Sequence, residues 1–216
     1  MKQKGIILMA AVISVAGILT ACTSKKTDYL VLVNKYSHLP DGWEKNIELV
    51  RAKNAWNEDV RLEKETYKQY KKLANDLKKD GVIIVLDSIY RSVKQQQELW
   101  DRWSKDPEKG IDYAKKYAAV PGYSEHHTGL AVDIVIKKNG KLIEENEDMI
   151  KERKIFEKIQ KKLAKYGFIL RYLEGRDDIT GYSYEPWHLR YVGSTKIAKE
   201  IMSKDITLEE YLKKDK

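Results

Sequence analysis

Residues 124–133 read SEHHTGLAVD and residues 185–191 read EPWHLRY, and together they hold three of the chain's four histidines. Residues 129–136 have the composition of a β-strand, in which successive side chains point to opposite faces. Apolar side chains on both faces predict that Asp133 is enclosed. A buried carboxylate needs a partner, a proton or a metal ion, so this stretch predicts a polar site within an otherwise apolar strand.

The histidines beside these strands supply ligands for such a site. His126 precedes Asp133 across a Thr-Gly step at which the chain can bend, and His188 arrives from a separate strand. Two imidazoles and one carboxylate with an open fourth position are typical of a catalytic zinc site. A structural zinc site would usually include thiolates, and the sequence has one cysteine. His127 is expected to point away from the site, and His38 to be structural.

A candidate base lies close to His188. Glu185 is three residues before it, and Pro186 favours an extended backbone at Glu185, which excludes the helical HExxH arrangement. A carboxylate beside a metal can take a proton from the attacking water. We therefore assign Glu185 as the candidate general base and Trp187 as a packing residue of this strand.

Apolar periodicity and turn signals predict helices mixed irregularly with strands, as in the α+β class. The predicted strands are residues 29–34, 82–87, 129–136, 168–173 and 187–192. The predicted helices are residues 61–79, 92–103, 150–166 and 194–203. An Asn-Gly pair at residues 139–140 predicts a hairpin turn. Residues 104–123 are expected to form a polar connection, and residues 207–216 a short exposed helix or tail.

Residues 1–21 have the pattern of a secretion signal, with a basic start, an apolar run and a Leu-Thr-Ala ending before Cys22. This ending resembles a bacterial lipoprotein signal, in which Cys22 carries the lipid. A transmembrane anchor is the alternative, because the apolar run approaches the roughly 20 residues that span a bilayer. Residues 22–28 would form a short linker, and residues 29–216 one extracytoplasmic domain tethered to the membrane.

The formal net charge of +8 favours anionic surroundings. Nucleic acid is the usual partner of a basic chain, but an exported, tethered protein rarely meets it, so we expect no nucleic-acid partner. Phosphate-bearing wall polymers and lipid headgroups are nearer, and lysines that merely keep the protein soluble are the alternative. With Cys22 as its only cysteine, the chain is expected to form no internal disulfide. We also expect a monomer.

The two motif stretches resemble those of the zinc D-alanyl-D-alanine carboxypeptidases of the VanY type and their LdcB relatives. The resemblance rests on S-x-H-x-x-G-x-A-x-D at residues 124–133 and on E-P-W-H at residues 185–188. Further matches are I-Y-R-S at residues 89–92, Y-G-F at residues 166–168 and I-T-G-Y at residues 179–182. The similarity spans residues 29–192 and implies a VanY/hedgehog-like fold, in which a small antiparallel sheet carries the zinc site between helices.

The resemblance also implies a role for each matching residue. Three residues are implied to bind zinc: His126, Asp133 and His188. Glu185 is implied to act as general base and acid. Arg91 is implied to polarise the scissile carbonyl or to hold a substrate carboxylate, because a planar guanidinium can make two hydrogen bonds at once. Two further residues, Gln96 and Ser124, are implied to grip the terminal D-alanine.

The function implied by the resemblance is removal of the C-terminal D-alanine from peptidoglycan stem peptides during cell wall remodelling. D,D cleavage of a pentapeptide and L,D cleavage of a tetrapeptide use the same zinc chemistry, so the motifs leave both open. A non-catalytic wall-binding lipoprotein is one alternative, although it would not need Glu185 together with all three ligands. A wall endopeptidase is another, and it would leave internal cleavage products.

Overall fold

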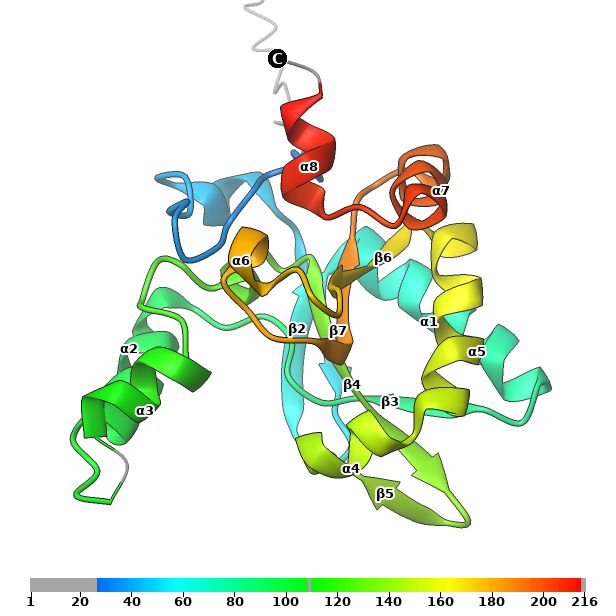
Figure 1. The fold of residues 1–216 in the computed structure, drawn as a ribbon, viewed down its shortest axis with the longest axis horizontal. Coiled ribbons are helices and arrows are strands. Elements are labelled where there is room, and N and C mark those ends of the chain that lie inside the picture. The colour runs from blue at the N-terminus through cyan, green and yellow to red at the C-terminus, as the bar shows by residue number, and fades with distance from the viewer. Residues whose placement is uncertain (1–26, 109, 215–216) are drawn as a thin grey trace, which may run out of the picture.

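The computed structural model describes residues 27–108 and 110–214. The predicted α+β class is confirmed, because a five-stranded antiparallel sheet is flanked by helices and accompanied by a two-stranded hairpin (Figure 1). The strands are β1 (Leu49–Lys53), β2 (Asp59–Glu63), β3 (Ile83–Leu86), β4 (Ala131–Lys138), β5 (Lys141–Ile143), β6 (Phe168–Tyr172) and β7 (Glu185–Tyr191). The α-helices are α1 (Lys64–Lys79), α2 (Val93–Ser104), α3 (Gly110–Tyr117), α4 (Asn146–Lys151), α5 (Arg153–Leu163), α6 (Asp177–Thr180), α7 (Thr195–Lys204) and α8 (Leu208–Lys213). Three short 3-10 helices are η1 (Trp43–Asn46), η2 (Glu125–Thr128) and η3 (Ala164–Tyr166).

The large sheet has the strand order β3-β4-β7-β6, and β5 pairs with β4 at one end. The predicted hairpin joins β4 to β5, where Asn139 and Gly140 both have positive φ angles, of 52° and 79°. A two-residue turn of this kind matches the twist of the strands it connects. β4 and β7 lie in the middle of the sheet, so both of the motif stretches enter its centre.

One face of this sheet is apolar and carries the main hydrophobic core. Alternate side chains of β4, β6 and β7 point to this face, among them Val132, Ile134, Phe168, Leu170 and Leu189. α1 and α5 cover it with apolar residues at helical spacing, including Leu73, Leu77, Phe156, Ile159 and Leu163. Figure 1 shows the two helices on the same side of the sheet.

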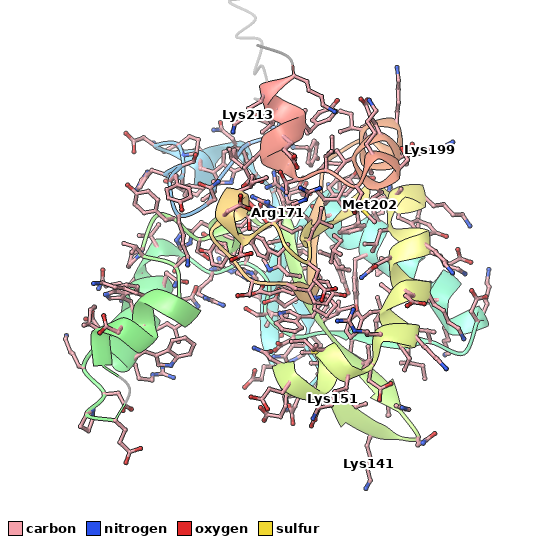
Figure 2. The ribbon with its side chains drawn as sticks, in the orientation of Figure 1. Lys141, Lys151, Arg171, Lys199, Met202 and Lys213 are labelled. Atoms are coloured by element: carbon pink, nitrogen blue, oxygen red, sulfur yellow. The ribbon has the colours of Figure 1, made fainter. Side chains whose placement is uncertain are left out.

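The opposite face of the same strands is polar. Its side chains include Asp133 of β4, Arg171 of β6, and His188 and Arg190 of β7. Residues 27–39 and the start of α8 cover this face, because Arg190 donates to carbonyls of the N-terminal segment and Arg171 donates to a carboxylate of α8. Arg171 lies inside the fold in Figure 2, whereas the labelled lysines extend from its surface.

Several predicted elements differ from the structure. Residues 29–34 form no strand, although Val31 and Val33 are buried. The helix predicted from Arg61 begins at Lys64, because residues 59–63 pair with β1 and the Glu63 carboxylate accepts hydrogen bonds from the first free backbone N–H groups of α1.

The second group of differences lies in the connecting regions and at the C-terminal end. The predicted polar connection at residues 104–123 contains α3, which packs against α2. The helix predicted at residues 150–166 is divided into the end of α4, α5 and η3. α8 is not an exposed tail, because Leu208 and Glu209 are buried against the polar face.

The predicted signal sequence at residues 1–21 and the predicted lipidation of Cys22 lie outside the described residues. Among residues 27–108 and 110–214, no helix combines the length and the apolar character needed to cross a bilayer.

Candidate metal centre and active site

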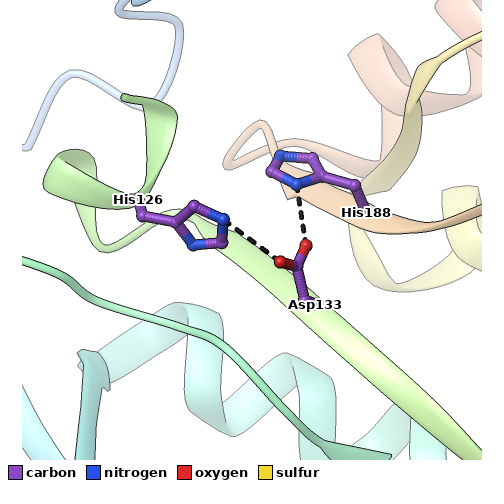
Figure 3. Close-up of side chains that lie close together, drawn as sticks. All are labelled: His126, Asp133 and His188. Atoms are coloured by element: carbon purple, nitrogen blue, oxygen red, sulfur yellow. Dashed lines mark ion pairs between the residues drawn. The ribbon is translucent and has the colours of Figure 1, made fainter. Parts of the chain in front are cut away.

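The three side chains assigned to the metal meet at one point on the polar face (Figure 3). Asp133 Oδ2 lies 3.2 Å from His126 Nε2, and Asp133 Oδ1 lies 2.7 Å from His188 Nδ1. One ligand atom from each residue lies within 4.8 Å of the other two. The register of β4 and β7 places Asp133 directly opposite His188, so strand pairing itself brings two of the ligands together.

This cluster fits a zinc ion on chemical grounds. Two imidazole nitrogens and a carboxylate oxygen are ligand types that zinc prefers, and three protein ligands leave a position for water or substrate. Asp133 Oδ1 is buried and accepts no well-directed hydrogen bond from any residue that the structure describes. A buried acceptor in that state is costly, and a cation would satisfy it.

His126 is held so that Nε2 faces the site. It belongs to η2, which ends at Gly129 in the left-handed conformation with φ of 70°. Its Nδ1 lies 2.8 Å from the carbonyl oxygen of Ile89, which can only accept, so Nδ1 carries the proton and Nε2 keeps its lone pair. Burial lowers the pKa of His126, although Asp133 opposes this effect. The imidazole is therefore kept neutral, as a metal ligand requires.

His188 faces the site with the other ring nitrogen. Its Nδ1 lies toward Asp133, and its Nε2 lies 3.0 Å from an oxygen of Glu125. Burial disfavours the imidazolium, but the two carboxylates outweigh burial and raise the pKa of His188 to about 10. The negative charge that holds a proton at Nδ1 also attracts a divalent cation to the same position.

Glu185 begins β7 at the edge of this cluster. One of its carboxylate oxygens lies 3.9 Å from His188 Nδ1, and the extended backbone predicted from Pro186 is observed. Burial raises the pKa of Glu185 to about 7, with His188 opposing the shift and Asp133 adding to it. A carboxyl group with a pKa near neutrality can both accept and donate a proton.

Arg91 approaches the cluster from the segment between β3 and α2. Its two terminal nitrogens donate hydrogen bonds of 2.7 Å to Gln96 Oε1 and to Ser88 Oγ. Gln96 is fully buried and also donates to the carbonyl of Ala119, so both ends of its amide are engaged within the protein. In this geometry Gln96 holds Arg91 in place, and direct contact of Gln96 with a substrate stays a prediction.

Two further residues of the first motif, Ser124 and His127, make contacts within the protein. Ser124 is buried, and its carbonyl accepts a hydrogen bond from the His127 backbone. The His127 ring points away from the metal ligands and bridges two backbone groups, with Nδ1 2.6 Å from the Arg91 carbonyl and Nε2 accepting from Gly122. Contact of Ser124 with a D-alanine also stays a prediction.

A column of aromatic rings, not predicted from the sequence, packs against the cluster. The Tyr172 ring lies 4.7 Å from the His188 ring, and the Tyr182 ring lies 4.7 Å from Tyr172, both measured between centroids. Lys35 Nζ lies 4.6 Å above Tyr182. This stacking could not be predicted because tyrosine is abundant in the chain, and no local sequence feature distinguishes Tyr172 and Tyr182 from the other tyrosines.

Two acidic residues were also missed. Glu125 is fully buried, and although burial alone would raise its pKa, Arg171, Arg190 and His188 hold that pKa well below its usual range. Asp87 follows β3, and burial together with the Asp133 charge raises its pKa to about 6. The usable signals were a carboxylate directly before His126 and another at the end of an apolar strand.

Comparison with known proteins gives the site its family context. The profile of the VanY family, described as D-alanyl-D-alanine carboxypeptidase, matches residues 59–194. A bifunctional D-Ala-D-Ala dipeptidase and carboxypeptidase of Enterococcus gallinarum, VanXYC, is 42% identical over 159 residues, which cover 71% of this chain and 78% of the relative.

Solved structures agree with this match. The LdcB LD-carboxypeptidase is 39% identical with a TM-score of 0.75, and the match covers 86% of each chain. A variant of the D,D-pentapeptidase VanY from the VanB-type resistance cassette, solved with Zn(II), is 31% identical with a TM-score of 0.66. That match covers 85% of this chain and 98% of the VanY chain. The sequence, the sheet and the arrangement of its motif residues place this chain in the VanY family of D-alanyl-D-alanine carboxypeptidases.

Proposed function

We propose that this chain is a zinc-dependent carboxypeptidase that removes the C-terminal D-alanine from peptidoglycan stem peptides. The single observation that carries the proposal is the convergence of His126, Asp133 and His188 at one point, with Glu185 at the edge of the cluster. The family match and the zinc complex of a related enzyme support it. Bound zinc would polarise the scissile carbonyl and acidify a water molecule.

The chain's own residues supply proton transfer and charge stabilisation. Glu185 would take the proton of the attacking water on its carboxylate and later deliver it to the leaving amine. The Arg91 guanidinium would hold the developing oxyanion or the substrate carboxylate. A guanidinium has five N–H donors, and the bonds to Gln96 and Ser88 use two of them, so donors remain for a substrate.

Glu185→Gln tests this mechanism directly. The variant should keep its zinc and lose hydrolysis by roughly 10²–10⁴-fold, because the amide has the size of the carboxylate but accepts no proton. His188→Ala should lose both zinc and hydrolysis. Zinc content measured by elemental analysis, together with turnover of purified muropeptides, checks both variants. Undiminished turnover in Glu185→Gln would remove Glu185 from the mechanism.

The choice of peptide bond is decided by the products. Mass spectrometry after incubation with pentapeptide and tetrapeptide muropeptides separates D,D from L,D cleavage, because each removes D-alanine from only one of the two substrates. Internal fragments would instead indicate a wall endopeptidase. A zinc-loaded protein that binds these peptides without cleaving them would indicate a recognition module.

The proposed location is the outer side of the cell membrane, through a lipid on Cys22. The motif before Cys22 and the wall substrate of the family support this location. Mass spectrometry of the mature N-terminus would detect the lipid, and an unmodified N-terminus upstream of Cys22 would contradict it.

A further inference from the structure

The Glu125 carboxylate is contacted by two guanidinium groups and one imidazole in the interior of the protein. Arg171 Nε and a terminal nitrogen of Arg190 donate to the same oxygen, Oε1, at 2.7 and 2.6 Å. His188 Nε2 lies 3.0 Å from the other oxygen, Oε2. Glu125 is only 3% exposed, so no solvent competes for these contacts.

We propose that Glu125 is a positioning residue that fixes the tautomer and the direction of His188, so that Nδ1 presents its lone pair to the metal. A neutral imidazole carries one proton, on one nitrogen or on the other. A carboxylate oxygen can only accept, so contact with Oε2 places the proton on Nε2. The inference rests on the metal binding proposed above, but not on which peptide is cleaved.

The two histidines are oriented by different kinds of hydrogen-bond partner. A backbone carbonyl contacts Nδ1 of His126 and leaves Nε2 free for the metal. A buried carboxylate contacts Nε2 of His188 and leaves Nδ1 free for the metal. Without Glu125, nothing described in the polar face would prevent the Nδ1–H tautomer of His188, which would point a proton at the metal position. A carboxylate partner also makes the imidazole a stronger base than a carbonyl partner does.

The two arginines fix the carboxylate itself. Arg171 is held by two bonds to Glu209, at 2.7 and 2.9 Å, and Arg190 is held by the carbonyls of Tyr29 and Val31. Because both guanidinium groups bind Oε1, rotation of the carboxylate is prevented and Oε2 is reserved for His188. Glu125 thus lies between these arginines and the metal-site residue His188.

The alternative is a purely structural role, in which Glu125 serves only as a counter-ion for the arginines. Glu209 offers a matched control for this alternative. Glu209 is buried and also binds Arg171, but the contacts described for its side chain, to Arg171 and Asn34, do not include His188. Glu125→Gln and Glu209→Gln each remove one buried negative charge from the same arginine cluster. Only Glu125→Gln changes the partner of a metal ligand.

The test is the zinc dissociation constant of wild type and both variants, measured by competition with a chromophoric chelator. Glu125→Gln should weaken zinc binding by about 10–100-fold, and Glu209→Gln by less than about threefold, even if both variants unfold at lower denaturant concentration than wild type. Equal zinc affinity in Glu125→Gln and wild type, or equal losses in both variants, would overturn the proposal. Failure of wild type itself to bind zinc would instead overturn the proposed function.

A second measurement does not depend on any variant folding. Long-range proton–nitrogen NMR spectra of the zinc-loaded wild type should show His188 protonated at Nε2 and metal-bound at Nδ1, and His126 in the opposite arrangement. His188 bound through Nε2, or both histidines in the same arrangement, would contradict the proposed role of Glu125.

Discussion

The two faces of the central sheet are built from the same strands but bury opposite kinds of side chain. Leu189 and Arg190 are neighbours in β7 and are both fully buried, yet one lies in the apolar core and the other binds Glu125. The apolar face is stabilised by burial of apolar surface area, an interaction that has no preferred direction. The polar face is stabilised by directed hydrogen bonds between charges, which fix the positions of individual atoms.

This difference separates the two tasks of the fold. The apolar face gives most of the driving force for folding, and it tolerates small shifts because hydrophobic contacts are adaptable. The polar face costs desolvation energy, which its paired charges offset only when every partner is present. In return it holds the Asp133 and His188 side chains at defined distances on adjacent strands.

Adjacent substitutions in β7 give the largest expected effects and test this separation. Arg190→Met should destabilise the protein by about 3–5 kcal/mol, because it leaves Glu125 buried with one cation fewer and leaves the carbonyls of Tyr29 and Val31 without their donor. Leu189→Ala should cost about 2–5 kcal/mol through the cavity it creates in the core. Urea unfolding without zinc measures both losses.

Zinc affinity then distinguishes these two variants. Arg190→Met frees the Glu125 carboxylate and should weaken zinc binding, whereas Leu189→Ala should leave the zinc affinity of the folded protein close to that of wild type. If Leu189→Ala weakened zinc binding as much as Arg190→Met, the two faces would not be separate in function.

The three residues of the candidate metal site could be located from the sequence because their signals are local. A carboxylate in an apolar strand, a histidine before that strand and a Glu-Pro-Trp-His stretch can each be read within ten residues. Strand and helix periodicity also predicted β3, β4, β6, β7, α1, α2 and α7 to within a few residues. These elements carry their own apolar pattern and their own end signals, such as the Ser92 cap of α2.

The supporting contacts could not be predicted because their partners are distant in the chain. Residues 29–34 have the apolar composition of a strand, yet two of their carbonyls accept from Arg190 instead of from a neighbouring strand. Glu125 and Arg171 are 46 positions apart. Nothing local shows that either charge is buried, so composition favours the more common solvated position for both.

An effect of intermediate size is expected from His127, the neighbour of the candidate metal ligand His126. Burial lowers the pKa of His127 from 6.5 to about 4, and protonation would place a second donor on Nε2 opposite the Gly122 N–H. A pKa lowered in the folded state gives stability that is present above the unfolded value of 6.5 and is lost as pH falls through about 4. The loss at full protonation is up to about 3 kcal/mol.

His127→Gln isolates this contribution. The glutamine amide can donate to the Arg91 carbonyl and accept from Gly122 but does not titrate. Unfolding of the zinc-free protein, followed at about pH 7.5 and about pH 4.5, should show wild type losing more stability than the variant between the two values. Parallel losses in both proteins would show that His127 is not responsible for the acid sensitivity.

The smallest effect is expected from a charged group that is only partly shielded from solvent. Asp76 of α1 lies 2.9 Å from Lys165 Nζ and accepts a 2.8 Å hydrogen bond from Tyr166, next to a third contact with Lys162. Although it has several partners, as Glu125 has, its pair with Lys165 is open to screening by salt because the Lys165 side chain is 65% exposed. Asp76→Asn should therefore lower the melting temperature by only about 2 °C or less.

The stability loss in Asp76→Asn should shrink in about 0.5 M salt, whereas the loss in Arg190→Met should persist because the buried cluster is shielded from ions. A salt-independent loss in Asp76→Asn as large as that of Arg190→Met would show that the number of charged contacts, and not their burial, determines what they contribute to this fold.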